Sequence, residues 1–263
     1  MASLLNWKTA LLLCALANIK NWHFMWHIRF LRALIRRLTD PAPTKHLNPR
    51  YLFLPAISST RSPLLECDYN MHKSNSTYFT DMDISRGNLS LILFRKLFNP
   101  FPGPGQFMMI LGAAQCVWRK EILPYQPYEL WTRVLSWDEK WIYLVSHFVK
   151  PGFFQPTEYL MQSNPRVSRK SSKKEVPRDR QKAVYASSVA RYVFKNQKRT
   201  VPPEQVLRDC GLLPEDEEAL KEVERLRLRC LDAAQLKCGW DTVHDLFEPG
   251  DAALGRFTDL LWR

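Results

Sequence analysis

The spacing of apolar residues changes along the chain, and these changes outline an order of elements. From residue 75 to about residue 98 the apolar residues recur every three or four positions, as on one face of a helix. That face consists of Tyr78, Met82, Leu89, Leu93 and Leu97. Gly87 and Asn88 interrupt the pattern, so we expect a kink or a split there. A long helix is therefore predicted in the first half of the chain.

Four later runs are rich in Trp, Tyr, Val and Ile, which favour strands. They cover residues 106–123, 128–137, 140–149 and 182–195. Asp138 and Glu139 form a hairpin signal, and the third run is apolar on both faces, as in a central strand. A further extended segment, residues 51–60, precedes the helix. This order predicts an α+β fold in which a curved antiparallel sheet wraps one long central helix.

Helical spacing returns after residue 200. Residues 200–211 predict a short helix that Gly211 ends, and residues 214–235 predict a longer one, acidic at its start and basic later. One face of the longer helix carries Leu220, Val223 and Cys230 and should pack on the sheet. We therefore expect residues 200–263 to form a C-terminal helical extension.

Two apolar patterns occupy residues 1–38. Residues 9–19 are predominantly apolar, but a run of 11 residues is short for a membrane span. The next stretch places apolar residues on one helical stripe, with arginines off it. The stripe is Phe24, Ile28, Leu31, Ile35 and Leu38. This predicts a membrane-associating helix over residues 1–38; the alternatives are a helix packed on the protein's own core and a short signal anchor. Residues 39–50 contain three prolines and predict a linker.

The net charge of +12 is concentrated in two segments. Residues 1–39 hold six basic and no acidic residues, residues 166–182 hold eight basic and two acidic, and the rest carries 24 of each. A neutral body argues against a nucleic-acid-binding domain and suits contact with an anionic membrane surface. We interpret residues 163–182 as a basic flexible insert; a nuclear-localisation or nucleic-acid patch is the alternative. We expect a cytoplasmic protein associated with the endoplasmic reticulum or another internal membrane.

The six cysteines form no Cys-x-x-Cys pair, which indicates reduced thiols in a reducing compartment. The chain contains no metal-ligand cluster, no glycine-rich phosphate loop and no serine nucleophile elbow. We therefore expect neither a metal nor a cofactor. Cys67 is either a nucleophile or, more simply, a small buried hydrophobic residue.

Reactive side chains are concentrated directly before the long helix. Asp68, His72 and Asn75 lie within eight residues. An aspartate can act as a general base or as a nucleophile. An ordinary polar turn explains the same residues, because an aspartate stabilises the start of a helix and an asparagine can cap it. Both interpretations stay open from the residues alone.

Two stretches in this order carry a family resemblance. The first, Asp68-Tyr-Asn-Met-His72-Lys-Ser-Asn75-Ser-Thr-Tyr78, is similar to an Asp-x-x-x-His-x-x-Asn-x-x-Tyr signature. The second, residues 118–148, places a proline-containing turn before a Trp-Asp-x-Lys hairpin. Together they resemble the hotdog-fold thioesterases of the 4-hydroxybenzoyl-CoA thioesterase-like group, and within it the thioesterase-superfamily-member-6-like branch and its fungal relatives. Hydratases of this fold have four residues between Asp and His, where this chain has three.

The resemblance implies a hotdog domain over residues 51–199 and a homodimeric acyl thioesterase without a cofactor. Asp68 would be the general base or nucleophile, with His72 and Asn75 as the other catalytic residues. Backbone N–H groups of residues 74–76 would hold the oxyanion. Three residues would contact the substrate: Ser74, which replaces the family's usual second Asn, Ser76 and Tyr78. That substrate would be an acyl-CoA or a carrier-protein-bound acyl or polyketide chain, as in secondary metabolite biosynthesis.

Two other function classes remain open. One is a non-catalytic hotdog protein that binds lipid or acyl groups at a membrane surface. The other is an RNA- or chromatin-associated factor that uses the basic insert; salt-dependent nucleic-acid binding that depends on this insert would support it.

Overall fold

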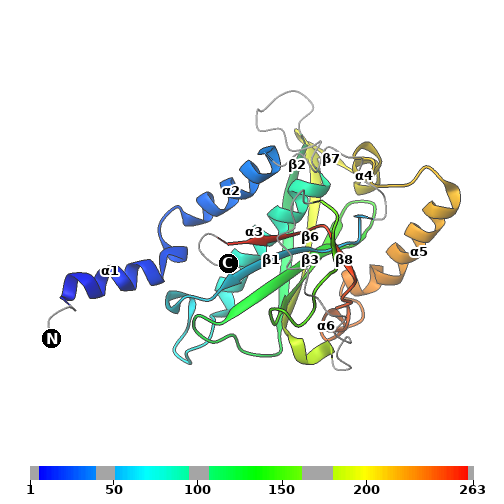
Figure 1. Ribbon diagram of the computed structural model, residues 1–263. Coiled ribbons are helices and arrows are strands. Elements are labelled where there is room, and N and C mark those ends of the chain that lie inside the picture. Colours follow the sequence, from blue (N-terminus) through cyan, green and yellow to red (C-terminus); the bar gives the residue numbers. More distant parts are fainter. Residues whose placement is uncertain (1–5, 40–50, 95–106, 162–179, 260–263) are drawn as a thin grey trace.

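The computed structural model describes residues 6–39, 51–94, 107–161 and 180–259 (Figure 1). Nearly all of the predicted linker and of the basic insert lies outside these residues. The described part has the predicted α+β architecture, in which the long helix α3 (Asn75–Leu93) lies against a curved sheet. This is a hotdog fold.

The main sheet has the strand order β2-β6-β4-β3-β1-β9. Its strands are β1 (Ala56–Arg61), β2 (Phe107–Trp118), β3 (Pro127–Trp137), β4 (Ile142–Val149), β6 (Val184–Asn196) and β9 (Gly255–Thr258). Neighbours pair antiparallel except β1 and β9, which are parallel. A short strand β7 (Arg199–Val201) pairs with β6, and β5 (Glu158–Tyr159) pairs with β8 (Ala252–Ala253) in a separate small sheet. The predicted strands and the central place of β4 are confirmed.

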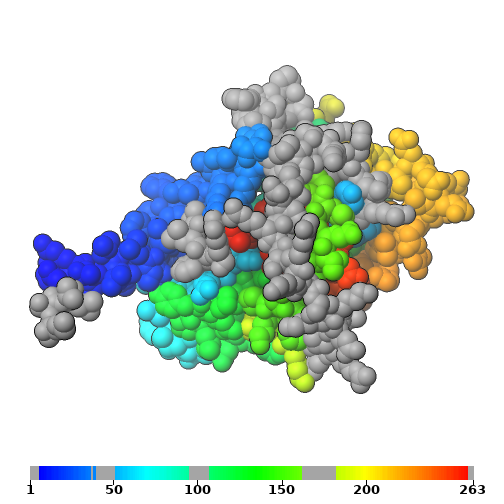
Figure 2. Space-filling model, in the orientation of Figure 1, coloured from blue at the N-terminus to red at the C-terminus, as the bar shows by residue number. Residues whose placement is uncertain are grey.

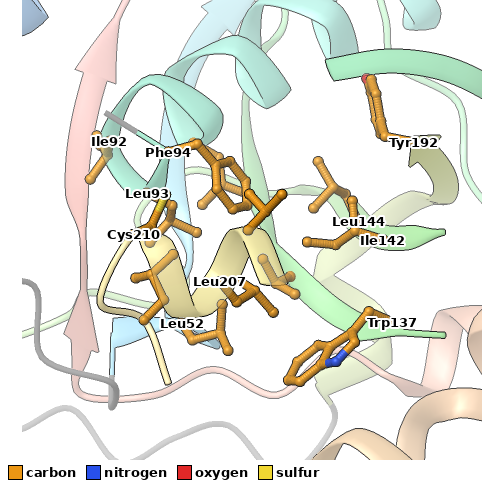
Figure 3. Close-up of a cluster of buried hydrophobic side chains, with 14 of the residues drawn as sticks. Leu52, Ile92, Leu93, Phe94, Trp137, Ile142, Leu144, Tyr192, Leu207 and Cys210 are labelled. Atoms are coloured by element: carbon orange, nitrogen blue, oxygen red, sulfur yellow. The ribbon is translucent and has the colours of Figure 1, made fainter. Parts of the chain in front are cut away.

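Helices cover both faces of the sheet. Successive side chains of β3 point to opposite faces, so each face contributes to a different apolar cluster. Val134 belongs to the apolar cluster on the α3 side, whereas its neighbour Leu135 belongs to the cluster under α5 (Glu217–Ala234). Figure 3 shows the first cluster, where Phe94 and Leu93 approach Leu207 and Cys210 at the end of the short helix α4 (Pro203–Asp209). The predicted packing of the long C-terminal helix on the sheet is therefore confirmed.

The predicted split at Gly87 is wrong, because α3 runs without interruption to Leu93. A Cβ atom at Gly87 would lie 2.7 Å from Cε2 of Phe30 in the helix α2 (Met25–Thr39). The glycine therefore allows α2 to approach α3 closely, a packing role and not a break in the helix.

Residues 6–39, here called the N-terminal arm, form two helices and not one. The helix α1 (Trp7–Ala17) buries none of its residues and projects from the body, as Figures 1 and 2 show. A 3₁₀ turn, η1 (Ile19–Asn21), connects it to α2, which packs along α3. Among the described residues, no helix is both apolar enough and long enough to cross a bilayer.

The predicted apolar stripe of α2 faces away from the body. All five of its residues are exposed, from 47% for Ile28 to 75% for Phe24. The opposite face is buried instead and consists of Met25, Arg29 and Ala33. The helix thus packs on the protein's own core through this face, and Phe30 adds its contact with Gly87.

The C-terminal extension is only partly helical. Besides α4, α5 and α6 (Thr242–Asp245) it contains the strands β8 and β9. The strand β9 extends the main sheet by pairing with β1, from Ala56 opposite Gly255 to Ser59 opposite Thr258. The prediction of an all-helical extension is therefore wrong at its end.

Candidate active site

Residues 66–74, here called the Asp68 loop, form a narrow turn between the 3₁₀ helix η4 (Leu64–Glu66) and α3. Cys67 and Lys73 form an antiparallel bridge at its base. One step further, the N–H of Asp68 donates to the carbonyl of His72 at 2.9 Å. The loop is therefore a small hairpin with a defined register.

Charged side chains of this hairpin point to opposite sides. Asp68 is exposed and His72 is half-buried, whereas Glu66 and Lys73 are buried. The carbonyl of Glu66 also accepts the N–H of Ser74 at 2.7 Å, which joins the loop to the start of α3. One short segment therefore presents two different sets of charges.

The outer set, called here the outer cluster, consists of Asp68, His72 and Glu121. The Nδ1 atom of His72 lies 3.9 Å from Oδ1 of Asp68, and its Nε2 atom lies 3.1 Å from Oε2 of Glu121. The three side chains are between 33% and 61% exposed. An imidazole between two accessible carboxylates can orient a water molecule and pass a proton.

Asp68 does not cap α3. The N-cap residue is Ser74, and its side chain makes no capping hydrogen bond. Oδ1 of Asp68 instead accepts the N–H of Asn70 at 2.9 Å within the loop. Asp68 thus takes part in a local polar turn, and the predicted cap, Asn75, is wrong because it is the first residue of the helix. The N–H groups of Asn75 and Ser76 have no partner within the helix.

The predicted substrate-contacting residues lie at different depths. Ser74 and Ser76 are at the surface, with their hydroxyl oxygens 3.3 Å apart. Tyr78 is buried, and its ring packs against Phe148 and, edge-on, against Trp118 at the end of β2. Any contact of Tyr78 with a substrate would have to occur beside Trp118, which is partly exposed.

Cys67 lacks the features of a reactive thiol. Burial raises the pKa of its thiol, and its sulfur lies 3.6 Å from the carbonyl oxygen of Pro63. A thiol with a raised pKa stays protonated near neutral pH and is a poor nucleophile. The simpler interpretation of Cys67, a small partly buried residue, is favoured.

The inner set, called here the inner cluster, lies beneath the loop. It contains three cations, Lys20, Arg29 and Lys73, and three carboxylates, Glu66, Asp81 and Asp259. Every one of these side chains is at most 7% exposed. Because removing charges from water is costly, such a cluster is tolerated only when each charge has close counter-charges.

Asp81 on α3 is the centre of the inner cluster. Its carboxylate lies 2.8 Å from Nζ of Lys20, 2.8 Å from Arg29 and 2.9 Å from Nζ of Lys73, and it accepts the hydroxyl of Tyr128. Burial alone would raise the pKa of Asp81, but these cations hold it well below its usual value. Asp81 is therefore ionised at neutral pH.

Two cavities in the described part of the chain lie away from Asp68. One follows the seam between the arm and the body, beside Arg29, Asp81 and Asp259. The other, of about 540 Å³, lies beside Trp141 and the end of α5. Among the described residues, no group of His, Cys, Asp and Glu is arranged to hold a metal ion.

The residue pattern did not reveal Glu121 or the inner cluster. Glu121 lies about 50 positions from His72 in the chain, and only the strand order brings them together. Lys20 was counted only as one of the six basic residues of residues 1–39. The one available signal was Lys73, a lysine inside the motif itself.

Comparisons with known proteins agree on one family. Residues 63–209 match the family model of the thioesterase-like superfamily. The thioesterase poxG of Penicillium oxalicum is 35% identical, with 92% of this chain and 87% of poxG covered. The probable thioesterase atnL of Emericella nidulans is 38% identical, with 78% and 71% covered. Among solved structures, the probable thioesterase YbaW of Escherichia coli is 10% identical with a TM-score of 0.41, covering 59% of this chain and 96% of YbaW. The chain belongs to the thioesterase-like superfamily and is a thioester hydrolase.

Proposed function

We propose that the chain hydrolyses an acyl-CoA or a carrier-protein-bound acyl or polyketide thioester, with Asp68 as the reacting carboxylate. The observation that carries this proposal is the position of Asp68. Its carboxylate is 40% exposed, lies close to His72 and belongs to the loop that leads into α3. No other carboxylate of the loop is accessible, because Glu66 is buried in the inner cluster.

The chemistry can follow two routes. As a general base, Asp68 takes a proton from water while the water oxygen attacks the thioester carbonyl carbon. As a nucleophile, its oxygen forms an anhydride with the acyl group, which water then hydrolyses. In both routes the carbon–sulfur bond breaks, and the thiolate leaves and takes up a proton.

The start of α3 supports both routes. Unpaired N–H groups at a helix N-terminus stabilise a developing oxyanion. Those around Asn75 and Ser76 are the nearest such groups along the chain. In this proposal His72 orients the water or relays a proton, and Asn75, Ser74 and Ser76 contact the thioester end of the substrate.

The test is hydrolysis of a panel of acyl and aroyl thioesters, on CoA and on a carrier protein, by the full chain. Asp68→Asn keeps the shape and the acceptor for Asn70, but removes the base. Asp216→Asn is the matched control, because Asp216 is exposed at the start of α5 and accepts the N–H of Ala219 at 2.8 Å. Activity lost in Asp68→Asn and kept in Asp216→Asn supports the proposal. Equal activity in both variants would overturn the role of Asp68, and no hydrolysis at all would favour a non-catalytic acyl-binding protein.

We also propose a homodimer that forms along β2. This 12-residue strand is at the edge of the main sheet and pairs only with β6 among the described strands. Its residues Met108, Ile110 and Leu111 are all exposed by more than 40%. A long apolar edge strand is a template for pairing with another chain. A partner there would lie beside Trp118, whose ring contacts Tyr78, and could complete an acyl-binding surface near Asp68.

Light scattering tests the dimer. We expect twice the chain mass for the natural protein and a monomer for Ile110→Lys, which places a charge on the edge strand. Leu123→Lys is a matched control, because Leu123 is equally exposed but lies outside β2. A monomeric natural protein, or a dimer in Ile110→Lys, would contradict this arrangement.

The N-terminal arm supports membrane association of a particular kind. The apolar stripe of α2 is exposed, and α1 exposes four leucines and Trp7. A helix that is apolar all round needs a cover, and α1 has none among the described residues. Lys20 and Arg29 are used inside the protein, so we propose that binding depends on apolar insertion more than on anionic lipid.

Sedimentation with phospholipid vesicles tests this. We expect the natural chain to bind neutral phosphatidylcholine vesicles and Leu31→Glu with Ile28→Glu to lose binding. Leu228→Glu, an exposed leucine on α5, is the control. Binding that requires anionic vesicles and survives the double substitution would contradict the apolar mode.

A further inference from the structure

The N-terminal arm contacts the segment that leads into the Asp68 loop. Nζ of Lys20 lies 3.0 Å from the carboxylate of Glu66, the first residue of the loop, and 2.9 Å from the carbonyl oxygen of Arg61. Oδ1 of Asn18 accepts the N–H of Leu65 at 2.9 Å. Two neighbouring arm residues therefore hold the entry of the loop from about 45 positions away in the chain.

The exit of the loop is held by the same charges. Nζ of Lys73 lies 2.5 Å from Glu66 and 2.9 Å from Asp81. Lys20 contacts both of these carboxylates as well, so each of the two ammonium groups pairs with each of the two carboxylates. Burial lowers the pKa of Lys73, but Asp81 and Glu66 raise it more, and its ammonium group stays charged. The base of the hairpin is thus fixed at both ends by one ionic contact set.

The charge balance of the inner cluster depends on the arm. The body of the chain contributes Lys73 against three buried carboxylates, and the arm supplies the two missing cations. The two arm cations differ in what they hold. Arg29 contacts Asp81 and Asp259, which lie outside the loop, whereas Lys20 contacts Glu66 within it.

We infer that Lys20 is a positioning residue for the proposed thioester hydrolysis: through Glu66 and Lys73 it holds the hairpin that presents Asp68. This inference rests on the proposed role of Asp68. It makes the N-terminal arm part of the apparatus that arranges the active site, in addition to any contact with a membrane.

The test compares Lys20→Met with Arg29→Met in the full chain. Each removes one buried cation of the arm, but only Lys20 contacts the loop. Hydrogen exchange, read by mass spectrometry on peptides from the loop and from β3 and β4, reports local opening, and kcat and KM report function. For Lys20→Met we expect exchange in the loop to accelerate by at least about tenfold relative to β3 and β4. We expect kcat to fall by about tenfold or more, with KM changed less than about threefold.

For Arg29→Met we expect lower thermal stability, with loop and sheet exchange changing together. Asn18→Leu removes the neutral hydrogen bond to Leu65 at the entry of the loop. It replaces Lys20→Met in the test if that variant does not fold. We expect a smaller acceleration of exchange in the loop. If exchange in the loop changes by the same factor as exchange in β3 and β4, in both Lys20→Met and Asn18→Leu, the inference is overturned and Lys20 has only a structural role. Hydrogen exchange is measured without a substrate, so it does not depend on the proposed function. An inactive natural protein would refute that function, as would full activity in Asp68→Asn. Neither result would change the exchange measured in the loop.

Discussion

The Asp68 loop contributes residues to both the outer and the inner cluster, and the two clusters differ in their exposure to solvent. Asp68 and His72 point outward, their nearest atoms are 3.9 Å apart, and both are partly exposed. Glu66 and Lys73 point inward, approach to 2.5 Å and are almost completely buried. Only Cys67 lies between Glu66 and Asp68, and His72 and Lys73 are adjacent in the chain.

The difference shows how one loop can combine reactivity and rigidity. An exposed carboxylate with a loosely placed partner keeps its access to water and substrate. A buried carboxylate surrounded by ammonium groups gives up that access, and its removal leaves uncompensated charge in the interior. We therefore expect substitutions in the inner cluster to change stability and substitutions in the outer cluster to change rate.

Asp81→Asn should have the largest effect. It leaves three buried cations with one carboxylate fewer, so we expect the free energy of unfolding to fall by about 3–5 kcal/mol. Asp232→Asn on α5 removes an exposed carboxylate that pairs with the equally exposed Lys237 and should cost less than about 1 kcal/mol. Urea denaturation measures both. Equal losses would erase the distinction between the buried and the exposed charges.

Asp68→Asn should lower kcat/KM by about 100-fold, which corresponds to about 2.7 kcal/mol in the activation barrier. Its free energy of unfolding should change by less than about 0.5 kcal/mol, because the side chain is exposed and Asn keeps the acceptor for Asn70. Steady-state kinetics and urea denaturation of the same preparation measure the two quantities. A large loss of stability would show that Asp68 supports the fold, as the residues of the inner cluster are expected to do.

The pH dependence of stability separates the clusters further. The pKa of Asp81 is lower in the folded chain than in the unfolded chain, so the unfolded chain binds this proton first as the pH falls. The stability that Asp81 contributes is complete above its ordinary pKa of about 3.9 and is lost below it, by at most about 1.4 kcal/mol per pH unit. Glu66 must be removed from this comparison, because burial and Asp81 raise its pKa. The difference in unfolding free energy between Glu66→Gln and the double variant Glu66→Gln with Asp81→Asn should therefore be constant from pH 5 to 8 and shrink below about pH 4. A difference that already shrinks between pH 7 and 5 would contradict this.

Glu121→Gln should have the smallest effect. The contact between Glu121 and His72 is exposed, and such pairs contribute at most about 1 kcal/mol, or about fivefold in rate. His72→Gln removes the imidazole itself and should cost more. A larger loss in Glu121→Gln than in His72→Gln would show that Glu121 itself acts on the substrate.

The strands and the long helix were predictable because their patterns reflect local contacts. Alternating and doubly apolar runs marked β3 and β4, and the helical repeat marked α3. The strand β9 was not predictable, because its four residues are too few to show an alternating pattern. They form a strand by pairing with β1. Gly87 was misread because propensity marks glycine as a helix breaker, whereas its close contact with Phe30 comes from tertiary packing.

The candidate site was predictable only in part, for the same reason. The motif around Asp68 lies within one short segment, so its residues could be read directly. The contacts of Lys20 with Glu66 and of Arg29 with Asp259 span about 45 and 230 positions, and nothing in local spacing indicates them. The sequence showed the apolar stripe of α2. It did not show that Arg29, on the opposite face, has buried partners.

The most direct test of the account is hydrogen exchange of the Asp68 loop in Asp68→Asn. The account assigns the chemistry to Asp68 and the support of the loop to the inner cluster. It predicts exchange in residues 66–74 within about twofold of the natural chain, although hydrolysis falls by about 100-fold. Exchange that accelerates in step with the loss of hydrolysis would contradict it, because Asp68 would then act by holding the loop and not by reacting.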